Sequence, residues 1–220
     1  NGIHRNAFIP PLILRFNMKI MVVGGGGREH AIIKKLKENK DSTEIFALPG
    51  NGGIAKDAIQ VNIGAKDIHG ITKFAADNAI DFAVVAPDDP LVLGAVDSLS
   101  AIGVPCFGPA ANAAIIEGSK VFSKNLMKKY NIPTARYEVF SAAADALGYI
   151  ENCTYPIVIK ADGLALGKGV IIAENKAAAL DAVHSVMEDK IFGASGNSVV
   201  IEEFLTGPEV SVLCFTDGKT

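Results

Sequence analysis

A glycine-rich stretch with two lysines is the part of the sequence best suited to chemistry. It occupies residues 160–170, KADGLALGKGV, between two apolar runs. Glycines let such a loop fold over phosphate groups, and Lys160 and Lys168 supply compact positive charges. It differs from a P-loop, because three residues rather than four separate Gly163 from Gly167 and no magnesium-binding hydroxyl follows. We expect a flap over a nucleotide; a plain hairpin with solvated lysines is the alternative.

An acidic segment further along the chain is a second candidate. IEEFLTGPEVS, residues 201–211, ends one predicted strand and begins another. Free backbone groups at such a junction can bind the edge of a planar ligand such as adenine. The carboxylates of Glu202 and Glu209 can accept hydrogen bonds from an amino group or from ribose hydroxyls. Alone, the segment would be a solvated loop; together with the glycine flap it indicates a nucleotide contact.

A second glycine turn, GGGGREH at residues 24–30, follows the first predicted strand and opens a helix. Backbone N–H groups and the helix dipole can hold an anion there. NAD binding is not expected, because Glu29 stands where GxGxxG requires its third glycine. Loops at 49–53 (PGNGG) and 86–90 (APDDP) also follow apolar runs and should lie at the same sheet edge. With Arg28 beside the turn, they predict a polar small-molecule site; ordinary turns are the alternative.

Two groups of elements must position these loops. Up to about Pro109, short apolar runs alternate with amphipathic stretches, which predicts βα units and a doubly wound parallel sheet. A long helical region at 110–130, which Gly118 and Ser119 could interrupt, then precedes closely spaced strands typical of an α+β unit with an antiparallel sheet. The predicted strands are 20–23, 45–48, 59–63, 82–86 and 104–107, then 137–140, 157–160, 169–173, 199–202 and 210–215, and the other predicted helices are 29–38, 68–78, 142–151 and 176–187.

Composition excludes several classes of protein. With 220 residues, 49% of them hydrophobic, the chain is neither disordered nor fibrous. A net charge of -3, with both signs mixed, offers no field to gather nucleic acid or an anionic membrane. Three widely spaced cysteines in apolar runs predict buried, reduced thiols and a cytoplasmic location. Residues 1–17 predict an extension outside the fold, with a targeting peptide as the weaker alternative.

Taken in order, GGREHA, PGN, EGSK, IPTA, IVIKADGLALGKGV and IEEFLTGPEVS resemble the phosphoribosylamine–glycine ligase family of the ATP-grasp superfamily. The resemblance extends over residues 18–220. It implies a pre-ATP-grasp parallel-sheet domain at 18–117, then an α+β ATP-grasp lid and the start of the large grasp subdomain at 118–220. It also implies ATP-dependent ligation of glycine to 5-phosphoribosylamine through glycyl phosphate, which gives glycinamide ribonucleotide, ADP and phosphate in purine biosynthesis.

The resemblance assigns residues to two ligands and none to catalysis. Lys120 and Lys160 would contact ATP phosphates, the EEFL segment at 202–205 would hold adenine, and Glu209 would bind ribose. The loops of the first sheet would face phosphoribosylamine. Asp88 is one methylene shorter than the glutamate usual in the family. The ATP-binding set is Lys120, Lys160, Gly163, Gly167, Lys168, Gly169, Glu202, Glu203, Phe204, Leu205 and Glu209, and the substrate-binding set is Gly26, Arg28, Glu29, Gly50, Asn51 and Asp88.

The family's Mg²⁺ ligands are expected beyond Thr220. The chain is therefore expected to hold no metal and, as a fragment, to be inactive alone. Two other functions remain open: a different ATP-grasp purine ligase, or a non-catalytic nucleotide-binding fragment. The expected partners are small molecules, with no nucleic acid and no membrane, and the oligomeric state is not predicted.

Overall fold

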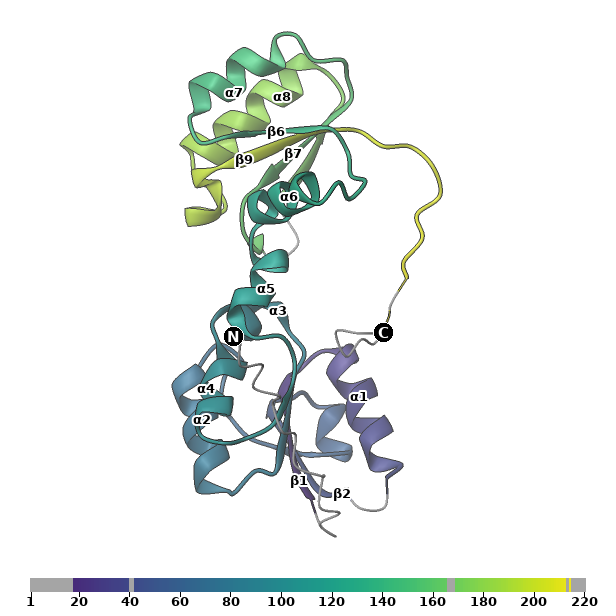
Figure 1. Cartoon of the computed structure of the whole chain (residues 1–220), viewed down its shortest axis with the longest axis vertical. Coiled ribbons are helices and arrows are strands. Elements are labelled where there is room, and N and C mark those ends of the chain that lie inside the picture. The colour runs from purple at the N-terminus through teal and green to yellow at the C-terminus, as the bar shows by residue number, and fades with distance from the viewer. Residues whose placement is uncertain (1–17, 40–41, 166–168, 213, 215–220) are drawn as a thin grey trace, which may run out of the picture. The chain divides into compact units, whose positions relative to one another are not determined.

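The computed structural model describes residues 18–39, 42–165, 169–212 and 214. These residues fall into two compact units, which divide between Gly118 and Ser119 (Figure 1). Each unit has its own sheet and its own hydrophobic core.

The first unit is built on a five-stranded parallel sheet in the order β3-β2-β1-β4-β5. The central strand β1 (Met18–Gly24) pairs in parallel with β2 (Ser42–Pro49) and with β4 (Phe82–Val85). β3 (Ile59–Gln60) and β5 (Cys106–Phe107) form the edges. β1 is apolar and buried on both faces from residue 20 onward, as expected for a central strand of a parallel sheet.

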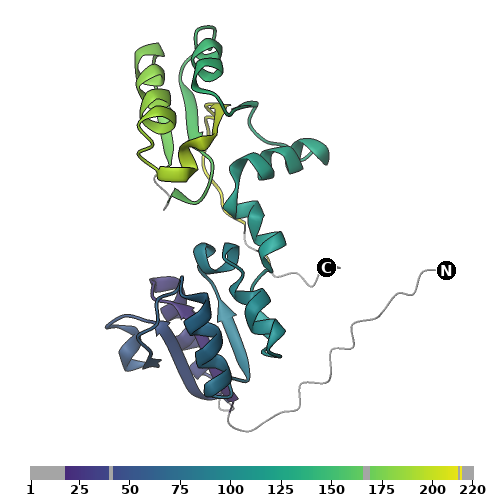
Figure 2. The same ribbon diagram turned by 90° about the vertical axis from the view of Figure 1, so that its left-hand side faces the viewer.

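Helices cover both faces of this sheet. α1 and the helix η1 pack on one face through Ile33 and Ile54, and α2 and α4 pack on the other through Ile71 and Leu99. Figure 2 views the unit from the α2 and α4 side. The predicted doubly wound sheet is thereby confirmed. The helices are α1 (Gly27–Lys37), η1 (Ile54–Lys56), α2 (Ile68–Asp77), α3 (Asp88–Val92), α4 (Ala95–Ala101) and α5 (Ala111–Gly118).

The edge strands are shorter than the sequence pattern predicts. The predicted strands at 59–63 and 104–107 shrink to two paired residues each, because an edge strand has a ladder partner on one side alone. Beyond Gln60 the chain turns, with the Ile63 N–H donating to the Val61 carbonyl at 2.7 Å. The region at 110–130 is two helices, because the Ser119 hydroxyl accepts the Phe122 N–H at 3.0 Å and caps a new one.

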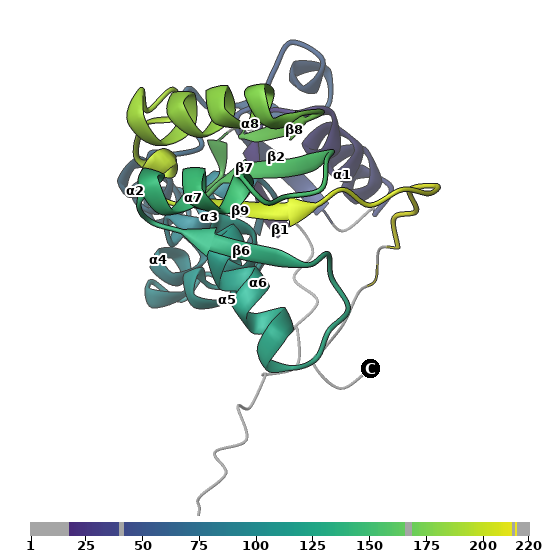
Figure 3. The ribbon, with the colours of Figure 1, turned by 90° about the horizontal axis from the view of Figure 1, so that it is seen from above.

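The second unit contains a four-stranded antiparallel sheet in the order β6-β9-β7-β8 (Figure 3). The strands are β6 (Tyr137–Phe140), β7 (Ile157–Ala161), β8 (Val170–Ala173) and β9 (Val199–Glu203). β7 and β9 pair at the centre, and β7 and β8 are the strands on either side of the glycine loop in the sequence. This arrangement confirms the predicted α+β unit.

Helices α7 and α8 lie on one face of the second sheet and α6 on the other (Figure 1). Ile157 and Ile159 of β7 and Ile201 of β9 point to the α7 and α8 side and are buried there. By strand alternation, Lys160 and Glu202 point to the opposite face. The helices are α6 (Lys120–Lys129), α7 (Ala143–Ile150), α8 (Lys176–Val183), its π-helical continuation η3 (His184–Glu188) and the 3₁₀ helix η4 (Gly193–Asn197).

Two sequence predictions at the carboxyl end are corrected. The predicted strand at 210–215 is wrong for Val210 to Val212, which are exposed and have no ladder partner among the described residues. Leu213 and Phe215 of that strand lie outside the described residues. Of the three thiols predicted to be buried, Cys106 and Cys153 are half-buried and Cys214 is exposed. Within the described residues, no helix has both the length and the apolar character needed to cross a membrane.

Candidate functional site

Three loops meet at the carboxyl edge of the parallel sheet. The Gly50 N–H donates to the Gly24 carbonyl at 3.1 Å, and the Asn51 Nδ2 donates to the Gly25 carbonyl at 2.7 Å. A Cβ added to Gly24 would lie 2.8 Å from Cγ of Pro87, in the third loop. The loops at 24–27, 49–53 and 86–90 therefore form one continuous edge, as the strand order required.

Glycine is needed in the first loop for two separate reasons. Gly24 has φ +123°, a backbone conformation that side-chain-bearing residues rarely adopt. A Cβ on Gly25 would lie 2.5 Å from the Gly50 carbonyl oxygen, so the close approach of the two loops excludes a side chain. The turn is therefore shaped for backbone contact between loops, with Gly26 and Gly27 exposed beyond it.

Glu29 and Arg28 have different environments. Glu29 is 3% exposed, and its Oε2 accepts the Gly26 N–H at 2.6 Å at the start of α1. Arg28 donates from Nε to the Glu29 Oε1 at 2.8 Å, while its side chain remains 56% exposed. Glu29 therefore caps the helix and orients Arg28, and Arg28 presents its charge to solvent beside the helix N-terminus. A direct ligand contact by Glu29 remains a prediction.

Asn51 holds the second loop in place. Besides its bond to Gly25, its Oδ1 accepts the N–H groups of Gly53 at 2.7 Å and Ile54 at 2.9 Å. Asp88 is exposed at the first position of α3, where a helix N-terminus favours negative charge. Of the predicted substrate-binding set, the structure thus brings Gly26, Arg28, Glu29, Gly50 and Asn51 together, with Asp88 on the third loop of the same edge.

An ion pair lies behind these loops. His30 Nε2 lies 2.8 Å from Asp57 Oδ2, and Lys37 Nζ donates to Asp57 Oδ1 at 2.9 Å. These hydrogen bonds, that of His30 first, lower the pKa of Asp57 to about 2. These contacts connect α1 to Asp57 at the end of η1, and so help to fix the position of α1 after the loop at 24–27.

A charged cluster lies on the face of the antiparallel sheet opposite α7 and α8. Lys160 Nζ donates to Glu202 Oε2 at 2.9 Å, and Lys124 Nζ of α6 lies 3.2 Å from the same oxygen. The other carboxylate oxygen, Oε1, is buried and has no hydrogen-bond partner among the described residues. A buried acceptor without a partner is costly, and it is satisfied when a ligand supplies a donor.

The start of the glycine loop is anchored to the N-terminus of α6. Lys120 Nζ donates to the Gly163 carbonyl at 2.6 Å. Asp162 accepts from the Ser119 hydroxyl at 3.0 Å and from the Val121 N–H at 3.2 Å. Lys120 and Lys160 thus both lie beside the entrance to the loop.

The glycines of this loop are tightly packed where the structure describes them. Gly163 has φ +110°, and a Cβ on it would lie 2.5 Å from the Ser195 hydroxyl. A Cβ on Gly169 would lie 2.6 Å from that of Ala165. Gly167 and Lys168, both in the predicted ATP-binding set, lie outside the described residues.

The EEFL segment does not act as one surface. Glu203 points to the opposite face from Glu202, where its carboxylate accepts from the Arg136 N–H and Nε, each at 2.8 Å. The backbone N–H and then the guanidinium of Arg136 lower the pKa of Glu203. Phe204, Leu205 and Glu209 are exposed beyond the end of β9. Glu202 joins the lysines, whereas the Glu203 carboxylate is engaged by Arg136.

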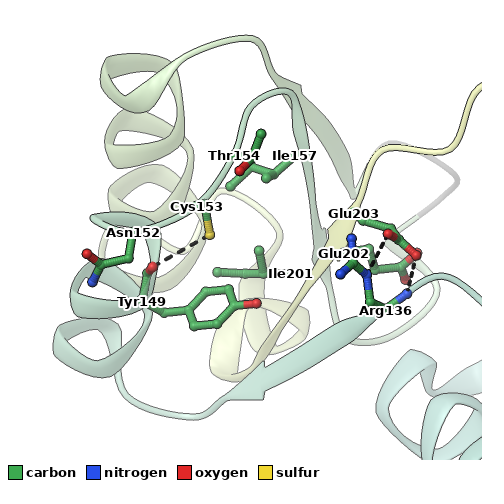
Figure 4. Close-up of a pocket in the computed structure, with 9 residues that line it drawn as sticks. All are labelled: Arg136, Tyr149, Asn152, Cys153, Thr154, Ile157, Ile201, Glu202 and Glu203. Carbon is green, nitrogen blue, oxygen red and sulfur yellow. Dashed lines mark hydrogen bonds and ion pairs between the residues drawn. The ribbon is translucent and has the colours of Figure 1, made fainter.

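A pocket of about 340 Å³ opens on the helix side of the same sheet (Figure 4). Figure 4 shows the Tyr149 ring and Cys153 beside Ile201, with the paired Arg136 and Glu203 at one end. Burial raises the pKa of the Cys153 thiol, so it is a poor nucleophile. The lining residues are Arg136, Tyr149, Asn152, Cys153, Thr154, Ile157, Ile201, Glu202 and Glu203.

Sequence reasoning missed Lys124, which is buried on the apolar side of α6, and Asp162, which anchors the glycine loop. A signal for Lys124 existed, because it falls three residues from both Val121 and Met127 on one helical stripe. Asp162 lies inside the KADG motif and carried no separate signal. The described residues contain no group of three or more His, Cys, Asp or Glu able to hold a metal ion.

A parallel-sheet unit, then an antiparallel sheet with lysines and a buried glutamate beside a glycine loop, defines a protein of the ATP-grasp class. Two family models match the chain. The N domain of phosphoribosylglycinamide synthetase matches residues 18–117, and the ATP-grasp (A) domain of the same protein matches residues 118–220. The chain belongs to the phosphoribosylglycinamide synthetase family.

Individual relatives agree with the family models. The phosphoribosylamine–glycine ligase of Clostridium acetobutylicum is 48% identical over 202 residues, which is 92% of this chain and 49% of that protein. The crystal structure of the same ligase from Thermotoga maritima has a TM-score of 0.71 and 30% identity, covering 87% of this chain and 45% of that one. The chain thus spans about half the length of the curated relatives it matches.

A more distant structure shares the fold alone. It is the biotin carboxylase domain of Hydrogenobacter thermophilus 2-oxoglutarate carboxylase, solved with MgADP, ADP and bicarbonate. Its TM-score is 0.68 at 16% identity, and the match covers 85% of this chain and 44% of that chain.

Proposed function

We propose that this chain supplies the phosphoribosylamine-binding domain, at residues 18–117, and the ATP-grasp lid with the start of the large grasp subdomain, at 118–220, of a complete protein that ligates glycine to 5-phosphoribosylamine. ATP would transfer its terminal phosphoryl group to the glycine carboxylate, giving glycyl phosphate and ADP. The amine of phosphoribosylamine would then attack the acyl carbon, lose a proton and displace phosphate. The single observation that carries the proposal is the Lys160–Glu202 cluster beside the glycine loop, with its unsatisfied carboxylate oxygen.

The face of the second sheet on which α6 lies suits a nucleotide. Val158 of β7 shares this face with Val170 and Ile172 of β8, the last two 44% and 51% exposed, which gives an apolar surface for a flat base. The unpartnered Oε1 of Glu202 can accept a hydrogen bond from an exocyclic amino group. Lys160 and Lys120, both beside the loop, can meet phosphates as point charges.

The loop edge of the first sheet suits a sugar phosphate or its amine. The N-terminus of α1 presents backbone N–H groups and a positive dipole end, and the half-exposed Arg28 adds a formal charge. Asn51 and Gly50 fix the second loop against the first, so the anion site is formed before a ligand arrives. Asp88 provides a carboxylate on the third loop for an amine.

The chemistry explains why a flap and a second substrate site belong together. A carboxylate is a poor electrophile until it is phosphorylated, and the acyl phosphate must be shielded from water. A glycine loop that closes over the phosphates provides that shield. Mg²⁺ is the cofactor we expect with ATP, and it would neutralise charge on the phosphates. The described residues offer no cluster of three His, Cys, Asp or Glu side chains to hold it.

We also propose that the complete protein works in the cytoplasm on small molecules. Cys106, Cys153 and Cys214 are free thiols, which suits a reducing compartment. The mixed charge and net value of -3 suit small ligands rather than nucleic acid.

Steady-state kinetics of the complete protein test the function. ADP release is expected to require both glycine and phosphoribosylamine, with other amino acids supplied in turn as controls. Equal ADP release with unrelated amino acids, or independence from the ribosylamine, would refute the assignment. Turnover with a different purine intermediate would identify another ATP-grasp ligase, and nucleotide binding without any ADP release would identify a non-catalytic binding module.

A further inference from the structure

Two ammonium groups share one oxygen of a buried carboxylate. Lys124 Nζ and Lys160 Nζ lie 3.2 Å and 2.9 Å from Glu202 Oε2. The side chains of Lys124 and Glu202 are 8% and 6% exposed, whereas that of Lys160 is 27% exposed. One negative charge therefore faces two positive charges in a largely dry site.

The two lysines are held differently. Lys124 also donates to the Thr134 hydroxyl at 2.7 Å, and its Nζ lies 5.3 Å from the centre of the Tyr137 ring. Its position is therefore fixed by protein groups on several sides. Lys160 is the penultimate residue of β7, next to the glycine loop, and its side chain is more exposed than that of Lys124. Of the two, Lys160 is the lysine whose ammonium group can leave Glu202 and pair with another anion.

A buried carboxylate needs a compensating charge, and removing one partner of such a pair is strongly unfavourable. If Lys160 alone compensated Glu202, its movement to a ligand would leave that charge unpaired. Lys124 removes this obstacle, because Glu202 keeps one cation whichever way Lys160 points.

We propose that Lys124 is a positioning residue of the nucleotide site: it keeps Glu202 paired so that Lys160 can turn from Glu202 to an anionic phosphate of the ligand. The inference rests on the proposed nucleotide binding. It assigns Lys124 no contact with the ligand. Its effect is to raise the fraction of protein in which Lys160 is available, and apparent affinity is proportional to that fraction.

The test compares ligands with and without phosphates on the complete protein. Isothermal titration would measure a non-hydrolysable ATP analogue and adenosine on the parent, on Lys124→Met and on a matched control, Lys128→Met, which removes an exposed lysine of the same helix. Lys124→Met should weaken the binding of the ATP analogue about tenfold and that of adenosine less than twofold. The reason is that a tenfold smaller fraction of protein with Lys160 available gives a tenfold weaker apparent affinity, and only for ligands that carry phosphate. Lys128→Met should change neither.

A second pair of variants covers the case in which Lys124→Met does not fold. Glu202→Gln removes the buried charge, so in Glu202→Gln with Lys124→Met no carboxylate holds Lys160 and no charge is left unpaired. The double variant should bind the ATP analogue within twofold of Glu202→Gln alone. Two results would overturn the role given to Lys124. One is a tenfold weaker affinity for the ATP analogue in the double variant than in Glu202→Gln alone. The other is an equal loss of affinity for adenosine and for the ATP analogue in Lys124→Met. If the parent binds no ATP analogue, the proposed function itself fails instead.

Discussion

Asn51 is expected to stabilise the first unit more than any exposed asparagine does. Asn51→Ala removes three hydrogen bonds: Nδ2 to the Gly25 carbonyl at 2.7 Å, and the N–H groups of Gly53 and Ile54 to Oδ1 at 2.7 and 2.9 Å. The bonds with Gly25 and Ile54 are partly buried, so each contributes about 1 kcal/mol, and water can replace the exposed one, which leaves about 0.5 kcal/mol. The expected loss is about 2.5 kcal/mol.

The protein contains its own optical reference for this measurement. It has no tryptophan, and its four tyrosines, at 130, 137, 149 and 155, all belong to the second unit. Urea unfolding followed by far-ultraviolet circular dichroism reports both units, whereas tyrosine fluorescence reports the second. Asn51→Ala should shift the part of the dichroism transition that tyrosine fluorescence does not follow. In the complete protein, the loosened loops should also raise the KM for phosphoribosylamine.

Two variants sharpen the interpretation. Asn51→Asp keeps both acceptor bonds and loses only the donor to Gly25, so it should cost about 1 kcal/mol plus any repulsion between the two oxygens. Asn62→Ala, at an exposed position of the same unit, should change stability by less than about 0.5 kcal/mol. If Asn51→Ala costs no more than Asn62→Ala, the three bonds do not hold the loops and the reasoning is refuted.

Three further predictions follow from the same geometry. In the complete protein, Lys160→Ala should weaken the binding of an ATP analogue, and Arg28→Ala should raise the KM for phosphoribosylamine. Each change should be about tenfold to a hundredfold, because a charge-assisted bond contributes about 1.5–3 kcal/mol. If titration and kinetics instead show weaker ATP-analogue binding in Arg28→Ala and a raised KM in Lys160→Ala, the two sites are assigned the wrong way round. Asp57 has a pKa of about 2, below the ordinary value for aspartate of about 3.9. Its contribution to stability is therefore complete above about pH 4 and is lost as the pH falls to 2. In Asp57→Asn the free energy of unfolding should lack this loss between pH 4 and 2, and parallel pH curves for the variant and the parent would contradict the prediction. Gly163→Ala should destabilise the second unit by about 1–3 kcal/mol, because Gly163 has a positive φ. Gly148 lies inside α7 with open space around it, so Gly148→Ala should stabilise the unit by about 0.5–1 kcal/mol. Urea unfolding followed by tyrosine fluorescence measures both free energies, and equal changes in the two variants would show that the backbone at 163 is unstrained.

The local patterns of the sequence were sufficient for the fold class and for most elements. Alternation in β7 places Ile157 and Ile159 on one face and Lys160 on the other, and this is set by residue spacing alone. The glycine turn at 24–27 is equally local, because it links a buried strand to a capped helix. Strand ends were predicted less well, since the length of β3 and β5 depends on where a neighbouring strand stops.

The partners of charged groups were decided by the tertiary structure. Adjacent glutamates must point to opposite faces of β9, but the sequence does not say which one meets a lysine. The register Val158↔Glu202 decides it, by bringing Glu202 beside Lys160 from 42 residues away. The same holds for Lys124, because a buried lysine is stable only when distant groups compensate its charge. Spacing along the chain determines which residues share a face, whereas the pairing of strands and the docking of α6 determine which charges meet on it.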